Sequence, residues 1–169
     1  MPKLNIYLAG GLFNLADRRR NIALAIALRA ADHGREIIIP QLEAERFRIS
    51  GTDRFVLTAV QEDCLKNCAD ENNVCVACLD GSDVDSGTAF EFGYAMAKTG
   101  RAIGFRTDFR TDEASEVGVN AMFKGKGAAF IYFPCFEAAL QGLDDFPLKL
   151  AQRIIDKIVA IEKVEGRAS

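Results

Sequence analysis

The sequence predicts an α/β fold built on a parallel sheet. Short apolar segments alternate with longer segments whose apolar residues recur at helical spacing along the 169-residue chain. The short segments are nearly continuous in apolar character, which is typical of strands buried on both faces of a sheet. Five such strands separated by helices predict a flavodoxin-like doubly wound sheet, all parallel, with helices on both faces.

The chain opens with a predicted strand and helix. The run Leu4–Ala9 has β-branched and aromatic residues and ends at Gly10-Gly11, so we expect a strand followed by a tight turn. Apolar residues at helical spacing predict a helix over Asp17–Asp32. A second strand is expected over Glu36–Ile39, because a proline closes that apolar run.

An irregular stretch precedes the central elements. We expect a helix over Thr52–Cys68, with Thr52 or Asp53 as its N-terminal cap. The third strand is expected over Val74–Leu79. The following helix, Gly87–Lys98, is apolar on nearly every side, which predicts a buried helix.

The last part of the chain supplies two strands and a helix. Strands are expected over Ala102–Phe105 and Ala128–Phe133, with a long charged connection, Arg106–Lys126, that is either functional or mobile. The final helix is expected over Pro147–Lys163, because proline fits the first turn of a helix. The length and the absence of a low-complexity linker predict one domain over residues 1–169.

Composition restricts the chemistry. Hydrophobic residues make up 49% of the chain and charged residues 27%, the balance of a globular protein. The 21 basic and 24 acidic residues give a net charge of −3, so we expect no nucleic-acid partner. His33 is the single histidine, which removes multi-histidine metal sites and leaves proton transfer to carboxylates, Tyr, Cys, Lys or Ser. We expect neither a metal nor a cofactor.

The cysteines and the N-terminus indicate the compartment. Five cysteines, an odd number, fit reduced thiols better than a disulfide framework. No basic segment with an apolar run opens the chain, and no apolar stretch reaches the ~20 residues that span a bilayer. We expect a cytoplasmic protein without a membrane partner. Cys75 and Cys78 form a C-x-x-C inside a predicted strand, where positions i and i+3 face opposite ways, so we expect core residues rather than a zinc site.

Two strand ends carry the candidate chemistry. After the first strand, the glycines of Tyr7–Asn14 allow the backbone to approach a ligand, but neither phosphate-loop spacing is present, and the glycines alone favour a simple turn. After the third strand come Asp80, Asp83 and Asp85, and Glu91 follows inside an apolar helix. Burial makes that carboxylate costly, while the nearby helix start stabilises an anion. We therefore expect Glu91 to be desolvated but ionised, as a carboxylate nucleophile must be.

The pair formed by Asp85 and Glu91 points to glycosyl chemistry. The two carboxylates are six residues apart, across a loop and a first helical turn, so both can face one cleft. Two carboxylates at one sugar are what glycosyl transfer uses.

Several segments resemble the nucleoside 2-deoxyribosyltransferases. They are Tyr7–Phe13, Leu79–Ala95, Ile103–Asp108 and Val119–Met122, and they follow the order of that family over most of the chain. The middle segment is the most specific, with Leu-Asp-Gly followed by Asp-Ser-Gly-Thr-Ala and Glu-x-Gly-Tyr-Ala. The resemblance implies an enzyme that moves 2-deoxyribose between nucleobases by a retaining double displacement, without cofactor.

The resemblance also implies roles for individual residues. Glu91 would attack C1′ of the deoxyribose and carry a deoxyribosyl ester. Asp85 would hold the sugar hydroxyls, and Tyr7 would orient Glu91. Phe13 would pack on the nucleobase, beside the backbone of Gly10.

Three further roles complete this expectation. Asp63 is the candidate proton donor, with Asp70 as its competitor, because the spacing to the third strand is longer than in the family. Gln41 is expected to read the base edge through its amide. Asn120 matches an asparagine lent to the site of a neighbouring subunit, which implies at least a homodimer.

Two alternative functions stay open. A deoxynucleoside 5′-monophosphate N-glycosidase would use the same nucleophile, with water resolving the intermediate. The loop Ala-Gly-Gly-Leu-Phe-Asn has no Ser or Arg to hold a phosphate, which favours unphosphorylated nucleosides. A non-catalytic nucleotide-sensing module on the same fold is disfavoured by the set Tyr7, Asp85 and Glu91. The motifs do not distinguish purine-only enzymes from mixed ones.

Overall fold

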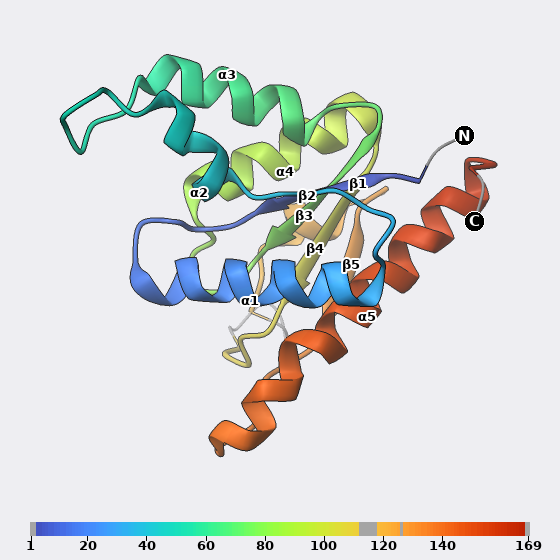
Figure 1. Cartoon of the computed structure of the whole chain (residues 1–169). Helices are drawn as coiled ribbons and strands as arrows, with labels where there is room; N and C mark the ends of the chain where they lie inside the picture. The colour runs from blue at the N-terminus through green and yellow to red at the C-terminus, as the bar shows by residue number, and fades with distance from the viewer. Residues whose placement is uncertain (1–2, 112–117, 126, 168–169) are drawn as a thin grey trace.

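The computed structural model describes residues 3–111, 118–125 and 127–167. Its sheet has five strands in the order β2-β1-β3-β4-β5, and every neighbouring pair is parallel (Figure 1). This confirms the predicted doubly wound sheet. The strands are β1 (Asn5–Ala9), β2 (Ile37–Ile38), β3 (Asn73–Cys78), β4 (Ala102–Arg106) and β5 (Ala129–Tyr132).

Helices cover both faces of the sheet, as predicted. On one face lie α1 (Leu15–Ala31) and α5 (Leu140–Val164), and on the other lie α3 (Leu57–Cys68) and α4 (Ser86–Thr99) (Figure 1). Side chains of β1 alternate between the two resulting cores. Ile6 and Leu8 join the core under α1 and α5, whereas Tyr7 joins the core under α3 and α4. This alternation aims the Tyr7 hydroxyl at the helices that carry the candidate nucleophile.

The C-x-x-C segment lies in β3, where both thiols are free and buried. Cys75 belongs to the core under α3 and α4, and Cys78 belongs to the core under α1 and α5. The prediction of two core residues on opposite faces is confirmed.

The helix α4 is only partly buried, so the prediction of an all-round buried helix is wrong. Its buried side chains are Thr88, Phe92 and Ala95, while Phe90 is 59% exposed. The sheet covers one side of this helix and α3 lies against its flank, which leaves the side that carries Phe90 exposed (Figure 1). It ends at Gly100, whose φ of 68° suits a glycine.

The segment before α3 is also less helical than predicted. After α2 (Pro40–Glu43) and the 3₁₀ turn Ala44–Phe47, the chain forms a turn, and α3 begins only at Leu57. The Thr52 hydroxyl donates to the carbonyl of Ile49 and accepts from the backbone of Arg54, so it stabilises the turn rather than capping a helix. Asp53 pairs with Arg48 instead.

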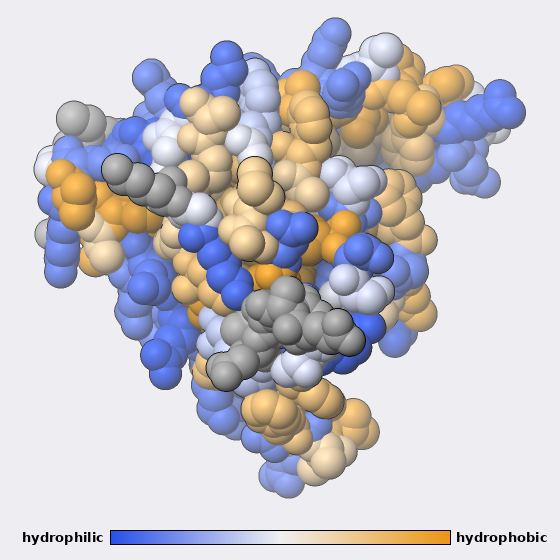
Figure 2. All heavy atoms as spheres, turned by 180° about the vertical axis from the view of Figure 1, so that it is seen from behind, coloured by the Kyte–Doolittle hydropathy of each residue, from blue (hydrophilic) through white to orange (hydrophobic). Residues whose placement is uncertain are grey.

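The helix α5 begins at Leu140 and runs through Pro147, so the predicted start at Pro147 is wrong. Proline inside a helix removes one hydrogen bond and costs about 3 kcal/mol. Packing offsets this cost, because Phe146 contacts Phe133 with ring centroids 5.0 Å apart and lies against the core. The first turns of α5 project from the body (Figure 1), and apolar side chains gather at that projecting end in Figure 2.

The long connection after β4 is described only in part. Residues 112–117 and 126 of the predicted segment 106–126 lie outside the described residues. The described part includes the 3₁₀ helix Ala121–Lys124, whose cap is Asn120. No helix in the described ranges has the length and apolar character that a membrane span requires.

Candidate active site

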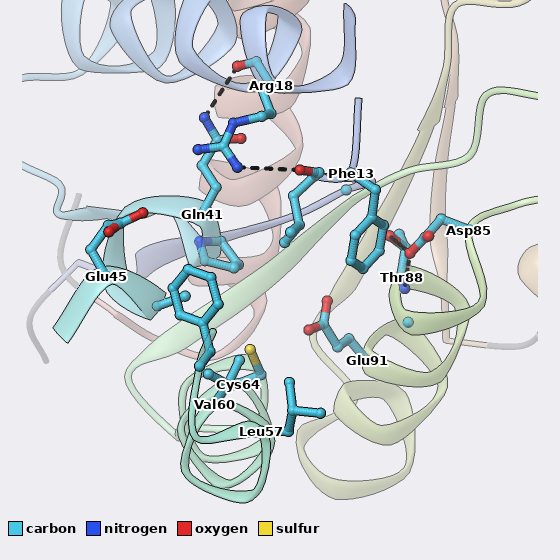
Figure 3. Close-up of a pocket in the computed structure, with 16 residues that line it drawn as sticks. Phe13, Arg18, Gln41, Glu45, Leu57, Val60, Cys64, Asp85, Thr88 and Glu91 are labelled. Atoms are coloured by element: carbon cyan, nitrogen blue, oxygen red, sulfur yellow. Dashed lines mark hydrogen bonds between the residues drawn. The ribbon is translucent and has the colours of Figure 1, made fainter. Parts of the chain in front are cut away.

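A cavity of about 560 Å³ lies at the carboxyl ends of β1, β2 and β3 (Figure 3). In the sheet, β2 pairs with one edge of β1 and β3 pairs with its other edge. The strand order therefore reverses at β1, beside this cavity. Ligands bind at such points in doubly wound sheets. The lining comes from the loop after β1, from α2, from α3 and from the start of α4.

Glu91 and Tyr7 meet at the floor of this cavity. The Tyr7 hydroxyl donates a hydrogen bond of 2.8 Å to Oε1 of Glu91. Tyr7 is 1% exposed, held in β1 between β2 and β3, so its position is fixed by the sheet. Glu91 is half-buried in the second turn of α4 and its carboxylate points into the cavity (Figure 3).

Burial dominates the electrostatics of Glu91. It raises the pKa of the carboxyl above its ordinary value, and the negative charge of Asp85 acts in the same direction. The hydrogen bond from Tyr7 and the nearby thiol of Cys64 oppose the rise in this pKa without cancelling it. The pKa of Tyr7 is raised as well, first by burial and then by the charge of Glu91, so its hydroxyl keeps its proton. Glu91 is therefore a carboxylate whose donor, Tyr7, is neutral.

Asp85 caps the helix that carries Glu91. Its Oδ2 accepts hydrogen bonds from the backbone N–H of Thr88 at 2.9 Å and from the Thr88 hydroxyl at 3.0 Å. A capping aspartate fixes the first turn of a helix. Asp85 also lines the cavity, so one residue both sets the position of α4 and presents carboxylate oxygen to a ligand. The predicted pair of carboxylates does face one cleft.

A buried amide network supports the glycine loop. Asn21 of α1 donates to the carbonyl of Gly11 at 3.0 Å and to Oε1 of Gln41 at 3.1 Å. Gln41 in turn donates to the carbonyl of Arg18 at 3.2 Å. A Cβ at Gly10 would lie 3.0 Å from the Asn21 side chain, so the loop approaches α1 too closely for a larger residue. Gln41 lines the cavity, but these bonds engage both ends of its amide.

The outer part of the cavity is mostly aromatic and apolar. Phe13 is 84% exposed, and its ring lines the cavity together with Asp85 and Glu91 (Figure 3). Phe55 and Pro40 line it as well. Arg18 is the one cationic side chain among the described lining residues, and its guanidinium donates to the carbonyl of Leu12 at 3.3 Å. An apolar cleft with a few polar groups is the usual form of a small-molecule site.

The two candidate proton donors lie elsewhere. Asp63 accepts a hydrogen bond of 2.5 Å from Arg46 and lines a separate polar pocket. Asp70 lines the same separate pocket and accepts from the backbone of Asn72. Adjacent helix residues point about 100° apart, so the face of α3 that meets the cavity is the one that carries Cys64, not Asp63.

Asn120 lies outside the cavity as well. Its side chain accepts from the backbone N–H of Met122 at 3.0 Å, which caps the 3₁₀ helix. It lines a groove on the other flank of α4, together with Phe92 and Met96. Asn120 is exposed and Met122 is 82% exposed. Within one chain the structure does not bring Asn120 to Glu91.

Several lining residues were missed from the sequence. Leu57, Val60 and Cys64 share one face of α3, and the spacing of three and four residues was visible in the sequence. Arg18 and Glu45 also line the cavity. No local signal marks these two, because they reach the site only through the folding of α1 and of the 3₁₀ turn after α2 around the loop.

Comparisons with known proteins agree with this geometry. A family model described as nucleoside 2-deoxyribosyltransferase matches residues 6–122, more than half of the chain. No curated protein matches.

Solved structures show the same fold. A conserved protein from Enterococcus faecalis V583 is similar with 24% identity and a TM-score of 0.55, over 94% of this chain and 98% of that one. A 2-desoxiribosyltransferase from Leishmania mexicana is similar with 21% identity and a TM-score of 0.52, over 85% and 98%. An azoreductase from Bacillus anthracis str. Sterne has 12% identity and a TM-score of 0.50, over 93% and 100%, so the fold by itself does not decide the chemistry. Together with the family model, the cavity with its paired carboxylates leads to one conclusion: the chain belongs to the nucleoside 2-deoxyribosyltransferase family.

Proposed function

We propose that this protein exchanges the nucleobase of 2′-deoxynucleosides, with Glu91 as the nucleophile. The observation that carries the proposal is the carboxylate of Glu91, which faces an apolar cavity while the Tyr7 hydroxyl holds it at 2.8 Å. A nucleophile needs a fixed, desolvated position and an ionised form. The neutral Tyr7 hydroxyl fixes the position of the carboxylate without adding a positive charge that would pair with it.

The reaction proceeds in two displacements. A Glu91 oxygen attacks C1′ of the deoxyribose, the C1′–N bond breaks, and its electron pair stays on the departing base, which takes up a proton. The product is a deoxyribosyl ester on Glu91. A nitrogen of a second base attacks C1′ from the opposite side, loses its proton and releases the carboxylate, so the configuration is retained. The exchange is redox-neutral and uses a protein carboxylate, so it requires neither cofactor nor metal.

The remaining residues fit the two ends of a nucleoside. Asp85 would accept hydrogen bonds from the sugar hydroxyls, beside the Glu91 carboxylate. Phe13 and the backbone of Gly10 would face the base, since both line the cavity. The amide of Gln41 is hydrogen-bonded to Asn21 and to the carbonyl of Arg18. It would therefore hold Arg18 in place and could donate only its remaining N–H to the base.

Which residue supplies the proton to the departing base can be tested directly. Asp63 would reach the base only if its ion pair with Arg46 opened, and Asp70 lies in the same separate pocket. If either carboxyl supplies the proton, Asp63→Asn or Asp70→Asn will slow base release. Unchanged rates in both variants would remove them from the reaction.

We also propose a homodimer in which Asn120 completes the site of the partner. The groove beside α4 supports this, since it is mostly apolar and adjoins the exposed Phe90 and Met122. The five free cysteines favour a reducing compartment, the cytoplasm, where salvaged nucleosides and free bases are both present.

The decisive experiment is a base-exchange assay. The protein is incubated with a 2′-deoxynucleoside and a different free base, and the new nucleoside is measured by chromatography. Glu91→Ala should abolish product, and mass spectrometry of digested wild-type protein should find deoxyribose on the peptide with Glu91. Wild-type turnover by Glu91→Ala would overturn the proposal.

The same assay separates the hydrolase alternative. If free base and free sugar appear even when an acceptor base is present, water resolves the intermediate. Faster reaction with deoxynucleoside 5′-monophosphates than with nucleosides would identify the N-glycosidase. A bound nucleoside with no turnover at all would identify the sensing module.

Mixing two inactive variants tests the shared site. In a dimer formed from Glu91→Gln and Asn120→Ala chains, one of the two sites has an intact glutamate and an intact asparagine. Random mixing should therefore restore about a quarter of the wild-type activity. Failure of the mixture, or a monomer by light scattering, would remove the proposed role of Asn120.

A further inference from the structure

The polar side chains that line the cavity gather on two sides of it. Asp85 and Glu91 lie on one side, in the first turns of α4. The other side has Arg18 of α1, Gln41 of α2 and Glu45 of the 3₁₀ turn after α2 (Figure 3). A nucleoside whose C1′ lies at the Glu91 carboxylate would therefore extend its base toward this second group.

The ring position opposite the glycosidic bond would reach these side chains first. It is C6 in a purine and C4 in a pyrimidine. Hypoxanthine, guanine, uracil and thymine carry a carbonyl oxygen there, which accepts hydrogen bonds, whereas adenine and cytosine carry an amino group, which donates them. The hydrogen-bonding groups on this side of the cavity therefore favour one of two classes of base.

A chain of hydrogen bonds fixes the orientation of the Gln41 amide. The Asn21 amide nitrogen donates to the Gly11 carbonyl at 3.0 Å and to Oε1 of Gln41 at 3.1 Å. The Gln41 amide nitrogen then donates to the Arg18 carbonyl at 3.2 Å. Backbone carbonyls only accept hydrogen bonds, so a flipped Gln41 would place two donors together and two acceptors together. Gln41 thus keeps a further N–H, while its oxygen is already bound.

The Arg18 guanidinium adds further donors on the same side. It is the one cation among the described side chains that line the cavity, and it donates to the Leu12 carbonyl at 3.3 Å. A guanidinium carries several N–H groups and no acceptor, and its planar fork pairs with two neighbouring acceptors. In a 6-oxopurine these acceptors are O6 and N7, whereas adenine presents a donor beside N7.

Glu45 does not cancel this excess of donors. Its two carboxylate oxygens accept from the Arg48 guanidinium at 2.7 and 2.8 Å, so a cation already pairs with its charge. An amino group of a base on this side would face the N–H groups of Arg18 and Gln41. Displacing water from these donors without supplying an acceptor costs free energy, which disfavours such a base.

We propose that Arg18 determines base specificity, and that the cavity takes bases with a carbonyl at purine C6 or pyrimidine C4 in preference to bases with an amino group there. The inference deepens the proposed function and rests on it, because it names the class of base that the reaction exchanges. The preference is larger for purines, where the guanidinium binds two acceptors, than for pyrimidines, where it binds one.

The kinetic test compares substrates that differ only at this ring position. The ratio of kcat/KM for deoxyinosine to kcat/KM for deoxyadenosine should fall about tenfold to a hundredfold in Arg18→Met. The ratio for deoxyuridine over deoxycytidine should fall by less. Arg19→Met, which removes an exposed neighbouring arginine outside the cavity lining, is the matched control and should leave both ratios unchanged. If Arg18 only supported the loop, both substrates would slow equally, and the unchanged ratio would overturn the inference.

A binding readout separates the inference from the proposed function. Calorimetric titration of Glu91→Gln, which keeps the nucleosides intact, should give tighter binding of deoxyinosine than of deoxyadenosine, and Arg18→Met in the same background should remove the difference. Equal binding, or tighter binding of deoxyadenosine, would overturn the inference even if base exchange is fully active. A wild-type protein without base exchange, combined with the expected binding difference, would overturn the proposed function and leave the role of Arg18 standing.

Discussion

Two glutamates of this protein are shielded from solvent, and they differ in the groups that bind their carboxylates. Glu162 lies on α5 at the amino-terminal edge of the sheet, is 2% exposed, and is bound by Arg35 at 2.6 and 2.8 Å and by the backbone N–H of Leu4 at 2.7 Å. Glu91 lies on α4 at the carboxyl edge, where the hydroxyl of Tyr7 donates to it at 2.8 Å. One carboxylate is fully paired with a cation, and the other accepts a hydrogen bond from a neutral tyrosine.

The difference separates a structural carboxylate from a reactive one. Burial alone would raise the pKa of Glu162, but the hydrogen bonds and charge of Arg35 outweigh it and lower that pKa. At Glu91 burial prevails and the pKa is raised. A carboxylate in a bidentate ion pair has no free lone pair directed at a ligand, whereas Glu91 borders a cavity. Loss of Glu91 should therefore lower the activity, whereas loss of the ion pair of Glu162 should lower the stability.

The largest expected effect is on activity. Glu91→Gln keeps the shape of the side chain but removes the attacking oxygen anion, so base exchange should fall by about 10⁴-fold or more. The melting temperature should not fall, because the amide no longer carries a desolvated charge. Steady-state kinetics and thermal unfolding of the same preparation check both. A folded variant with more than a few per cent of wild-type activity would show that Glu91 is not the reactive carboxylate.

The largest expected effect on stability is at the other glutamate. Arg35→Met leaves the Glu162 carboxylate buried without its cation, which should lower the free energy of unfolding by about 3–5 kcal/mol. The double variant Arg35→Met/Glu162→Leu should recover much of this loss, because it removes both charges. Urea unfolding measures the stability, and activity per folded molecule should stay at the wild-type level in each. An equal loss in both variants would show that packing rather than charge is responsible.

A smaller effect is expected from the donor to Glu91. Tyr7→Phe removes a hydrogen bond to a charged group, worth about 1.5–3 kcal/mol, so kcat/KM should fall about tenfold to a hundredfold. The acid limb of the pH profile should move upward, because the lost donor favoured the anion. Replacement of the half-buried Tyr94 of α4, which does not line the cavity, by Phe is a control, and its profile should not move. An unshifted limb in Tyr7→Phe would contradict the assigned role.

The smallest effect is the pH dependence of stability. The folded pKa of Glu162 is lowered, so its contribution is present above about pH 4.3 and is lost as pH falls further. The folded pKa of Glu91 is raised, so its contribution is present below about pH 4.3 and is lost as pH rises. Relative to wild type, Glu91→Gln should gain stability between about pH 4 and pH 7, and Glu162→Gln should lose it. Unfolding midpoints measured across this pH range test whether stability increases in Glu91→Gln and decreases in Glu162→Gln.

The sheet could be predicted from the sequence because its signals are local. The five strands are short apolar runs, and the right-handed crossing of helices between parallel strands restricts their order. The errors occur where distant contacts overrule a local signal. Phe146 and its contact with Phe133 extend α5 past Pro147, and the hydroxyl of Thr52 serves a turn instead of a helix cap.

The site was predictable to the extent that its residues are neighbours in sequence. Asp85 and Glu91 belong to one loop and helix, so their common cleft follows from helical geometry. Asp63 and Cys64 are adjacent, and only the rotation of α3 against the sheet decides which of them faces the cavity. Arg46, which draws Asp63 away, comes from a 3₁₀ turn that the sequence did not reveal.

The sequence by itself determined the doubly wound sheet, the helix that carries Glu91 and the identity of the paired carboxylates. These depend on apolar periodicity and on residues a few positions apart. The tertiary structure decided which donors touch Glu91, that its pKa is raised, and that Glu162 is bound by Arg35. Such properties depend on partners separated by tens of residues, and a local pattern does not identify those partners.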